Sequence, residues 1–387
     1  MEQVEEIKTA AAAEATADGQ PVKKKTERLF CLDLLRGLDM FLLVCLGPLM
    51  CAAYRVWKYP QPIVKQFWHT HIGFSLWDLI MPLFIFMCGV AIPYALCKRL
   101  KDNGKAGWEY WKHVLLRVFG LWVLAMFSNG GAFSLNYAKT WLFNNTLQAI
   151  AAGYLLTAIT MVLPKTWMRF AFPALLFLVQ AGFAHAYTSD YTRYDTTLAL
   201  RAEYACIRFF QPGHDVWTGG YSWYYGIPMY GFMTACGYHC AEVLRSQRGM
   251  WRKAVILFVT AAIMLALGRL LIALGIPSRK SIWTASYVLL AMGWSILALS
   301  TLYVLTDIWR LRRGLGLFIL YGQYALTAYL LGETTFRTLV VHLGKKITAG
   351  LPYLLGTDRY QDLALKISAI FIITAVLLIR RKLKARA

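Results

Sequence analysis

Apolar residues along this chain fall in long runs separated by short polar segments. A helix that crosses a hydrocarbon layer about 30 Å thick needs roughly 20 consecutive apolar residues. Lipid offers the backbone no hydrogen-bond partners, so such runs are expected to be α-helical. The pattern predicts an all-α, polytopic membrane protein with about ten transmembrane helices, at residues 30–56, 76–97, 111–128, 146–163, 167–187, 220–243, 253–274, 282–306, 314–334 and 363–380.

The composition supports this class. Hydrophobic residues make up 58% of the 387 residues and charged residues only 16%, whereas soluble domains carry about 25% charged residues. The mean hydropathy is +0.47. The predicted membrane domain, residues 30–380, lies between a polar tail at 1–29 and a basic tail at 381–387. The two long loops, 188–219 and 335–362, could hold a small extramembrane cap and a segment that dips back into the membrane.

Lysine and arginine gather in alternate loops, which orients the predicted spans. With the N-terminus inside, the cytoplasmic loops carry most of these residues, and the outer loops are poorer in them. This positive-inside pattern predicts that both termini are cytoplasmic and that the number of spans is even. The formal charge of +21 then reflects topology and attraction to anionic membrane lipids, so nucleic-acid binding is not expected. The eight cysteines are scattered without a C-x-x-C pair, so neither a metal site nor a disulfide framework is expected.

Ionisable residues inside membrane spans are candidates for function because they are costly there. The first span opens with Asp33, Arg36 and Asp39. Residues three apart on a helix are neighbours, so the three side chains are predicted to share one face and to pair. Such a ladder could simply hold the span against a neighbouring helix, or it could bind a ligand that enters from the cytoplasm.

A second cluster lies on the opposite, outer side of the membrane. His69 and His71 precede Asp78, which opens the second span. A histidine can act as a general base near neutral pH, and a carboxylate can fix its tautomer. The ordinary alternatives are two solvated histidines and an aspartate that caps its helix.

The motifs around these clusters resemble the transmembrane acyltransferases related to heparan-α-glucosaminide N-acetyltransferase, especially the short bacterial members. The resemblance covers residues 28–380. Its motifs are Leu32-Asp33-x-x-Arg36-Gly37-x-Asp39-Met40, Gln66-Phe67-x-His69, Gly73-Phe74-x-x-x-Asp78-Leu79-Ile80-x-Pro82, Leu147-Gln148 and Lys280-x-x-Trp283-Thr284-x-Ser286-Tyr287.

The resemblance implies acetyl transfer across a membrane. Cytosolic acetyl-CoA would donate its acetyl group to an amino sugar or glycan on the outer face, without a metal. His69 would be the general base or acyl carrier, with Asp78 beside it and His71 as the alternative histidine. Arg36 and Arg117 are the candidates for binding the CoA phosphates, because the arginine fork suits such anions. The other candidates for the donor site are Asp33, Asp39, Gln148, Lys280, Trp283 and Thr284.

Several alternatives remain open at this point. The spacing from His69 to Asp78 is one residue shorter than the family pattern, and Ala149 stands where relatives carry arginine, so the acceptor is not determined. The acceptor group could be an amine or a hydroxyl, and a homodimer is one oligomeric state to consider. The resemblance to bacterial members suggests that the protein is located in the bacterial cytoplasmic membrane.

The competing function is a transporter or flippase of a sugar-like or glycolipid substrate without acyl chemistry, since charged spans and Gly/Pro breaks also serve transport. A third reading is a structural membrane partner of a larger glycan-processing complex.

Overall fold

The computed structural model describes residues 29–70, 72–101, 105–128, 141–188, 191, 197–213, 221–355 and 357–386. Within these ranges the regular elements are helices, with one isolated antiparallel bridge between Leu100 and Ala106. The elements are α2 (Phe30–Phe41), η1 (Leu42–Leu46), α3 (Gly47–Trp57), α4 (Gln61–Lys65), α5 (Leu76–Leu96), η2 (Cys97–Arg99), α6 (Trp108–Ser128), α7 (Thr146–Val162), α8 (Thr166–Tyr187), α9 (Leu198–Phe210), α10 (Ile227–Arg245), α11 (Met250–Ala273), η5 (Lys280–Ile282), α12 (Ala285–Tyr303), η6 (Val304–Ile308), α13 (Gly316–Gln323), α14 (Ala325–Glu333), α15 (Arg337–Thr348), α16 (Leu351–Leu355) and α17 (Gln361–Arg386).

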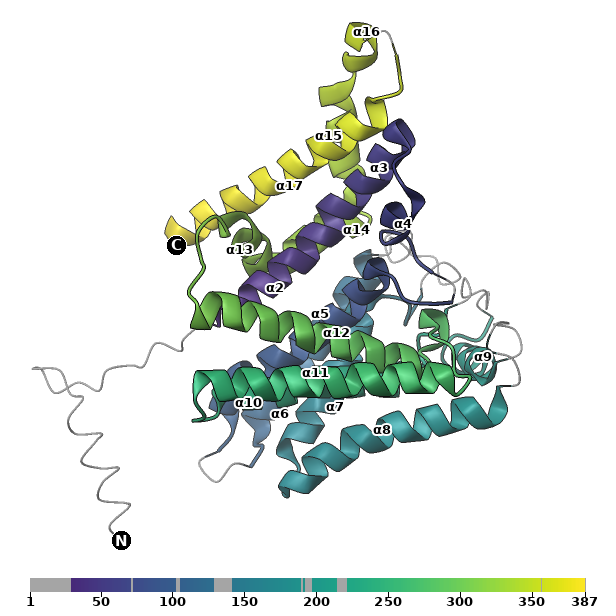
Figure 1. Cartoon of the computed structure of the whole chain (residues 1–387), viewed down its shortest axis with the longest axis vertical. Coiled ribbons are helices and arrows are strands. Elements are labelled where there is room, and N and C mark those ends of the chain that lie inside the picture. The colour runs from purple at the N-terminus through teal and green to yellow at the C-terminus, as the bar shows by residue number, and fades with distance from the viewer. Residues whose placement is uncertain are drawn as a thin grey trace, which may run out of the picture.

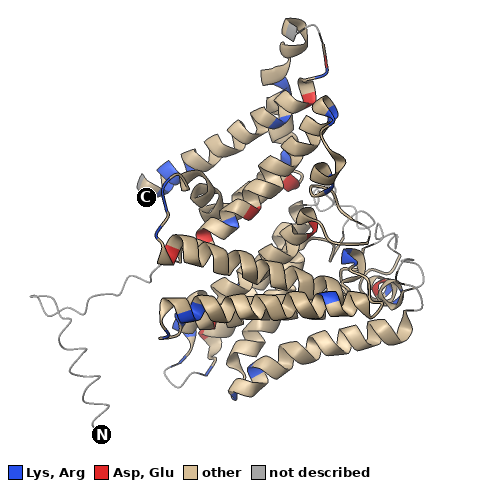
Figure 2. Cartoon of the chain, in the orientation of Figure 1, with Lys and Arg blue, Asp and Glu red and all other residues tan. Residues whose placement is uncertain are grey.

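The all-helical membrane class is confirmed. Seven helical stretches in the described part of the chain are long and apolar enough to cross a membrane: Phe30–Trp57, Leu76–Arg99, Trp108–Ser128, Thr166–Tyr187, Met250–Ala273, Ala285–Ile308 and Gln361–Ala385. The other three predicted spans coincide with helix α7, helix α10 and the pair α13–α14, which is interrupted at Tyr324. Figure 2 shows that α8, α11 and α12 are free of charge over most of their length, with charged residues toward their ends, whereas α2 carries several charged residues.

Helices α5 and α12 form the centre of the bundle. In their most apolar stretches 61% and 67% of the residues are buried, against 11% in α8 and 17% in α11. The outer helices therefore direct apolar side chains such as Leu178 and Val255 away from the protein. In water this surface would be an aggregation site, whereas in a bilayer it is the surface that lipid covers.

Glycines allow the central helices to touch through their backbones. A Cβ atom on Gly89 of α5 would overlap the carbonyl group of Thr234 in α10. A Cβ atom on Gly37 of α2 would likewise overlap the carbonyl group of Phe318 in α13. Close approach through small residues is how helices associate in lipid, where burial of apolar side chains provides little driving force.

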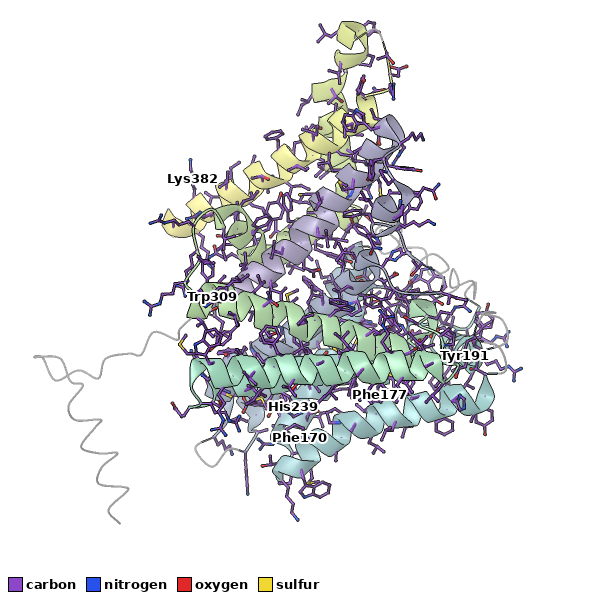
Figure 3. The ribbon with its side chains drawn as sticks, in the orientation of Figure 1. Phe170, Phe177, Tyr191, His239, Trp309 and Lys382 are labelled. Carbon is purple, nitrogen blue, oxygen red and sulfur yellow. The ribbon has the colours of Figure 1, made fainter. Side chains whose placement is uncertain are left out.

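Helices α2 and α3 form one long helix with a π-helical turn, η1, in the middle, and α17 packs beside it. Figure 1 shows that α2 begins and α17 ends on the same side of the molecule. In Figure 3, Trp309 and Lys382 mark this side, whereas Tyr191 lies near the opposite side. The same view shows Phe170 of α8 beside His239 of α10, whose rings stack with centroids 4.1 Å apart.

Candidate functional site

Asp78 is the most highly connected carboxylate that the structure describes. It lies in the first turn of α5, and Ser75 caps this helix in a reciprocal capping box, in which each side chain bonds the other residue's backbone N–H. Asp78 is only 1% exposed. Its Oδ2 accepts hydrogen bonds from the hydroxyls of Thr70 at 2.7 Å and Ser75 at 2.8 Å. These bonds hold the carboxylate in one orientation and leave Oδ1 for other partners.

His69 occupies the free oxygen. Its Nδ1 lies 3.0 Å from Asp78 Oδ1, and 64% of its side chain is exposed. An ionised carboxylate only accepts hydrogen bonds, so Nδ1 must carry the proton that is shared between the two groups. The other ring nitrogen, Nε2, is then free to accept a proton. His71 lies outside the described residues.

Lys280 is the second group at the same oxygen. Its Nζ lies 3.9 Å from Asp78 Oδ1, and its side chain is 9% exposed. Burial lowers the pKa of Lys280 to about 8, and the nearby Asp78 charge opposes this shift. The carboxylate therefore has a histidine and a lysine as competing partners.

The loop that carries Lys280 is held on both sides. Trp283 has a left-handed backbone with φ of 53°, which is unusual for a bulky residue, and its indole N–H donates to the carbonyl of Ser222 at 3.0 Å. The backbone N–H of Arg279 donates to the hydroxyl of Thr284 at 2.9 Å. Trp283 and Thr284, expected to bind the donor, thus lie where they shape the loop of Lys280.

The His69 loop and the Lys280 loop are also bonded to each other. The backbone N–H of Gly73 donates to the carbonyl of Ser278 at 2.8 Å, and the Ser278 hydroxyl donates to the carbonyl of Gly73 at 2.9 Å. Gly73 has φ of 122°, a conformation that glycine adopts readily. This pair of bonds keeps the two loops at Asp78 in register.

Helix α5 is tied to α12 at the same level. Pro82 has no N–H, so the Asp78 carbonyl four residues earlier has no helical partner. The hydroxyl of Tyr287 supplies it, at 2.7 Å. Both the side chain and the backbone of Asp78 are therefore fixed by hydrogen bonds.

His69 and Lys280 line a cavity of about 270 Å³, which we call the His69 cavity. It lies between η1, α5 and α14, and Met40, Ile80 and Phe84 form part of its apolar wall. Its other polar lining groups include Thr146, Tyr221, Tyr329 and Glu333. Its volume is slightly below the roughly 300–1,000 Å³ of most small-molecule sites, but an apolar wall with a few converging polar groups is typical of them.

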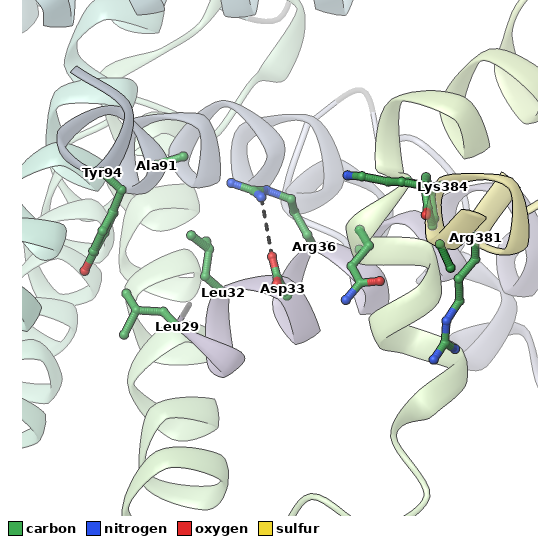
Figure 4. A pocket seen from close by; sticks show the side chains of 12 residues that line it. Leu29, Leu32, Asp33, Arg36, Ala91, Tyr94, Arg381 and Lys384 are labelled. Carbon is green, nitrogen blue, oxygen red and sulfur yellow. Dashed lines mark ion pairs between the residues drawn. The ribbon is translucent and has the colours of Figure 1, made fainter. Parts of the chain in front are cut away.

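A second cavity, the Arg36 cavity, lies between α2, α5, α13 and the C-terminal end of α17 (Figure 4). Its volume is about 530 Å³. Arg36 Nη1 lies 3.8 Å from Asp33 Oδ1, and Arg36 Nη2 donates to the carbonyl of Met87 at 3.5 Å. Arg381 and Lys384 of α17 line the same cavity. Three cations against one carboxylate make it suited to an anionic ligand.

The two cavities lie close to each other along α2 and α5, which line both of them. Met40 of the His69 cavity follows Arg36 by four residues, and Ala91 of the Arg36 cavity follows Phe84 by seven. At 1.5 Å per residue, the cavities are about 6–10 Å apart along α2 and α5.

The predicted ladder of three charges is wrong at its third member. Asp33 and Arg36 pair, but Asp39 lines a different cavity and has no hydrogen-bond partner among the described residues. The reason is geometric. Each step of three residues falls about 60° short of a full helical turn, so two steps turn Asp39 about 120° away from Asp33. Arg36 lies between the two carboxylates and pairs with Asp33.

Two other residues expected at the donor site make contacts within the protein. Arg117 lies over the ring of Tyr154, 4.9 Å from its centroid, and does not line the Arg36 cavity. Gln148 is fully buried, donates to the carbonyl of Leu142 at 2.6 Å and accepts from the backbone N–H of Asn144 at 2.7 Å.

Other residues of the site were not singled out from the sequence. Ser75 and Thr70 were missed, although Ser75-x-x-Asp78 has the spacing of a capping box. For Arg381 and Lys384 the sequence predicts only a basic C-terminal tail. Nothing in the sequence indicated that Glu333 and Tyr329 of α14 reach the His69 cavity.

Comparison with known proteins does not place this chain in a family. The chain matches none of the protein-family models against which it was scanned, and no curated protein matches it. The resemblance to the acyltransferases therefore rests on the motif residues alone.

Proposed function

We propose that this protein is a membrane-embedded acetyltransferase that moves an acetyl group from acetyl-CoA to an amine or hydroxyl of an amino sugar or glycan. The observation that carries the proposal is the His69–Asp78 pair at 3.0 Å, in which His69 lines a cavity with an apolar wall and several polar groups. The buried carboxylate holds the Nδ1 proton of His69, which frees Nε2 to act as a base.

In this mechanism Nε2 accepts the proton of the acceptor amine or hydroxyl while the acceptor attacks the thioester carbonyl. The new bond forms to the acetyl carbon, the carbon–sulfur bond breaks, and the CoA thiolate leaves and takes up a proton. The alternative is that Nε2 attacks first and carries the acetyl group. Asp78 stabilises the imidazolium in the first route and orients the ring in both.

The Arg36 cavity is the proposed donor site. CoA carries several phosphate charges, and Arg36, Arg381 and Lys384 offer the cations that would bind them. The separation of about 6–10 Å between the two cavities along α2 and α5 would let the thioester extend toward His69 while the nucleotide stays in the basic cavity.

The proposed topology has ten spans with both termini cytoplasmic. Leu29 and Lys384 line one cavity, so both ends of the described chain lie on one side of the molecule, which an even number of crossings requires. The seven long apolar helices become ten when α7, α10 and the interrupted pair α13–α14 also cross. The positive-inside pattern then places the Arg36 cavity in the cytoplasmic half and His69 outside. The proposed location is the bacterial cytoplasmic membrane.

The test uses the full-length protein in nanodiscs with acetyl-CoA, with and without glucosamine. We expect the release of free CoA thiol to depend on the amino sugar, with acetylated sugar formed in equal amount by mass spectrometry. An Arg36→Gln variant should need more acetyl-CoA for half-maximal turnover. Sugar accumulation in protein-containing liposomes without thioester loss would instead support a transporter. If neither thioester loss nor transport is observed, the protein would instead be a structural partner in a glycan-processing complex.

A further inference from the structure

Asp39 lines a third cavity, which shares Ile80 with the His69 cavity and no lining residue with the Arg36 cavity. This Asp39 cavity has a volume of about 350 Å³ and lies between α2–η1, α5, α12 and α13. Its other eleven lining residues are leucine, isoleucine, phenylalanine or alanine, among them Leu79, Leu83 and Phe318. Asp39 is therefore the one polar residue among those that line this cavity, and its two carboxyl oxygens are buried just behind the hydrocarbon wall.

Both carboxyl oxygens of Asp39 lack a hydrogen-bond partner among the described residues, and the residue is 2% exposed. The basic residue nearest along the helix, Arg36, is paired with Asp33 instead. A buried carboxyl group without partners costs the protein stability. An ionisable group kept inside a membrane span at such a cost is a sign of function.

The depth of Asp39 in the membrane and its single carboxyl group exclude several kinds of ligand. It follows the first residue of α2 by nine positions, about 14 Å along the helix, which is near the middle of a hydrocarbon core about 30 Å thick. A phospholipid headgroup stays at the membrane surface and does not reach this depth. A metal ion such as Ca²⁺ needs six or more oxygen ligands, and a water molecule needs two to four polar partners, whereas this wall offers a single carboxyl group.

We propose that the Asp39 cavity binds an apolar molecule that carries a single hydrogen-bond donor, an amine or a hydroxyl. The hydrocarbon part would fill the space between α5 and α13, and the Asp39 side chain would turn toward the cavity so that its carboxyl group accepts the hydrogen bond of the donor. A volume of about 350 Å³ is within the usual range for small-molecule sites. This site does not depend on the proposed acetyl transfer, because none of its contacts involves His69 or the Arg36 cavity.

The test is photolabelling of the full-length protein in nanodiscs. Three photoreactive alkyl probes of equal length end in an amine, a hydroxyl or a methyl group. We expect the amine or the hydroxyl probe to label the segments around Leu83 and Phe318 more strongly than the methyl probe. In Asp39→Leu the apparent affinity for that probe should fall about 2-fold to 10-fold, the scale of a lost hydrogen bond.

Two further variants make the outcome specific. Asp33→Asn changes a carboxylate on the same helix outside this cavity and should leave labelling intact. Asp39→Asn keeps hydrogen-bonding capacity but removes the charge, so it should retain a hydroxyl probe and lose an amine probe. Equal labelling by the methyl probe, undiminished labelling of Asp39→Leu, or no labelling of the cavity by any probe would each overturn the proposal.

Discussion

Two buried aspartates in this protein have opposite surroundings. Asp78, at the start of α5, is 1% exposed and receives hydrogen bonds from Thr70 and Ser75 as well as the His69 and Lys280 contacts. Asp39, in the middle of the first span, is 2% exposed and has no hydrogen-bond partner among the described residues. Equal burial therefore says little about the role of a carboxylate, and the number of its partners says more.

The difference arises from position within a helix. At a helix start the backbone N–H groups are unpaired and a loop precedes them, so Ser75 and Thr70 can turn their donors toward Asp78. In the middle of a helix the backbone groups already bond one another, and only neighbouring side chains remain. For Asp39 those neighbours are mainly leucines, such as Leu35, Leu38 and Leu42. The first carboxylate is built into the fold, whereas the second is left open to a ligand.

The largest expected effect concerns the histidine that Asp78 holds. General base catalysis typically contributes about 10²–10⁴-fold, so His69→Ala should lower acetyl transfer by that factor with acetyl-CoA binding nearly unchanged. Turnover and CoA affinity would be measured separately on purified protein. His71→Ala is the control and should cost far less. If the His71 variant were inactive and the His69 variant active, His71 rather than His69 would be the base.

The second prediction concerns stability at Asp78. Asp78→Ala leaves Lys280 as an unpaired buried cation and removes a set of hydrogen bonds, so it should lower the free energy of unfolding by about 3–5 kcal/mol. The double variant Asp78→Ala, Lys280→Met should recover part of this loss, because it also removes the stranded charge. Unfolding of the protein in detergent would be followed by circular dichroism. If the single and double variants have the same free energy of unfolding, the ion pair at 3.9 Å contributes nothing to stability.

The third prediction has the opposite sign. Asp39→Leu removes a buried carboxyl group without partners and should raise the free energy of unfolding by about 1–3 kcal/mol. The same denaturation measurement in detergent applies, without any of the alkyl probes. A loss of stability in Asp39→Leu would mean that Asp39 has a partner in the folded protein, and the contrast with Asp78 would then disappear.

The fold was largely predictable from sequence because each long apolar run became a helix. Where the prediction was incomplete, the cause was local. The ninth predicted span, 314–334, is interrupted at Tyr324, where the backbone leaves the helical region with φ of −117° and ψ of 30°. Apolar content alone does not report such a break. The π-helical turn at Leu42–Leu46 was invisible for the same reason.

The candidate site was predictable only where its residues are close in sequence. His69 and Asp78 are nine positions apart, and a helix start with a carboxylate indicated their contact. Lys280 is brought to the same carboxylate by tertiary packing, through the bonds between Gly73 and Ser278. Its position beside Asp78 therefore could not be read from spacing. Asp39 shows the limit of spacing itself, because three-residue steps drift around the helix.

The smallest expected effect is a pH dependence from Lys280. Burial lowers its pKa from the usual 10.5 to about 8 in the folded protein. Between these values the unfolded chain binds more protons than the folded one, so stability rises with pH across this window. The gain between pH 8 and pH 9 should be about 1 kcal/mol in the wild type and should be absent in Lys280→Met. The quantity to measure is the difference between the two unfolding curves, because other groups that titrate in this range contribute to both. Parallel curves would mean that the ammonium group of Lys280 is paired with Asp78 strongly enough to cancel the effect of its burial.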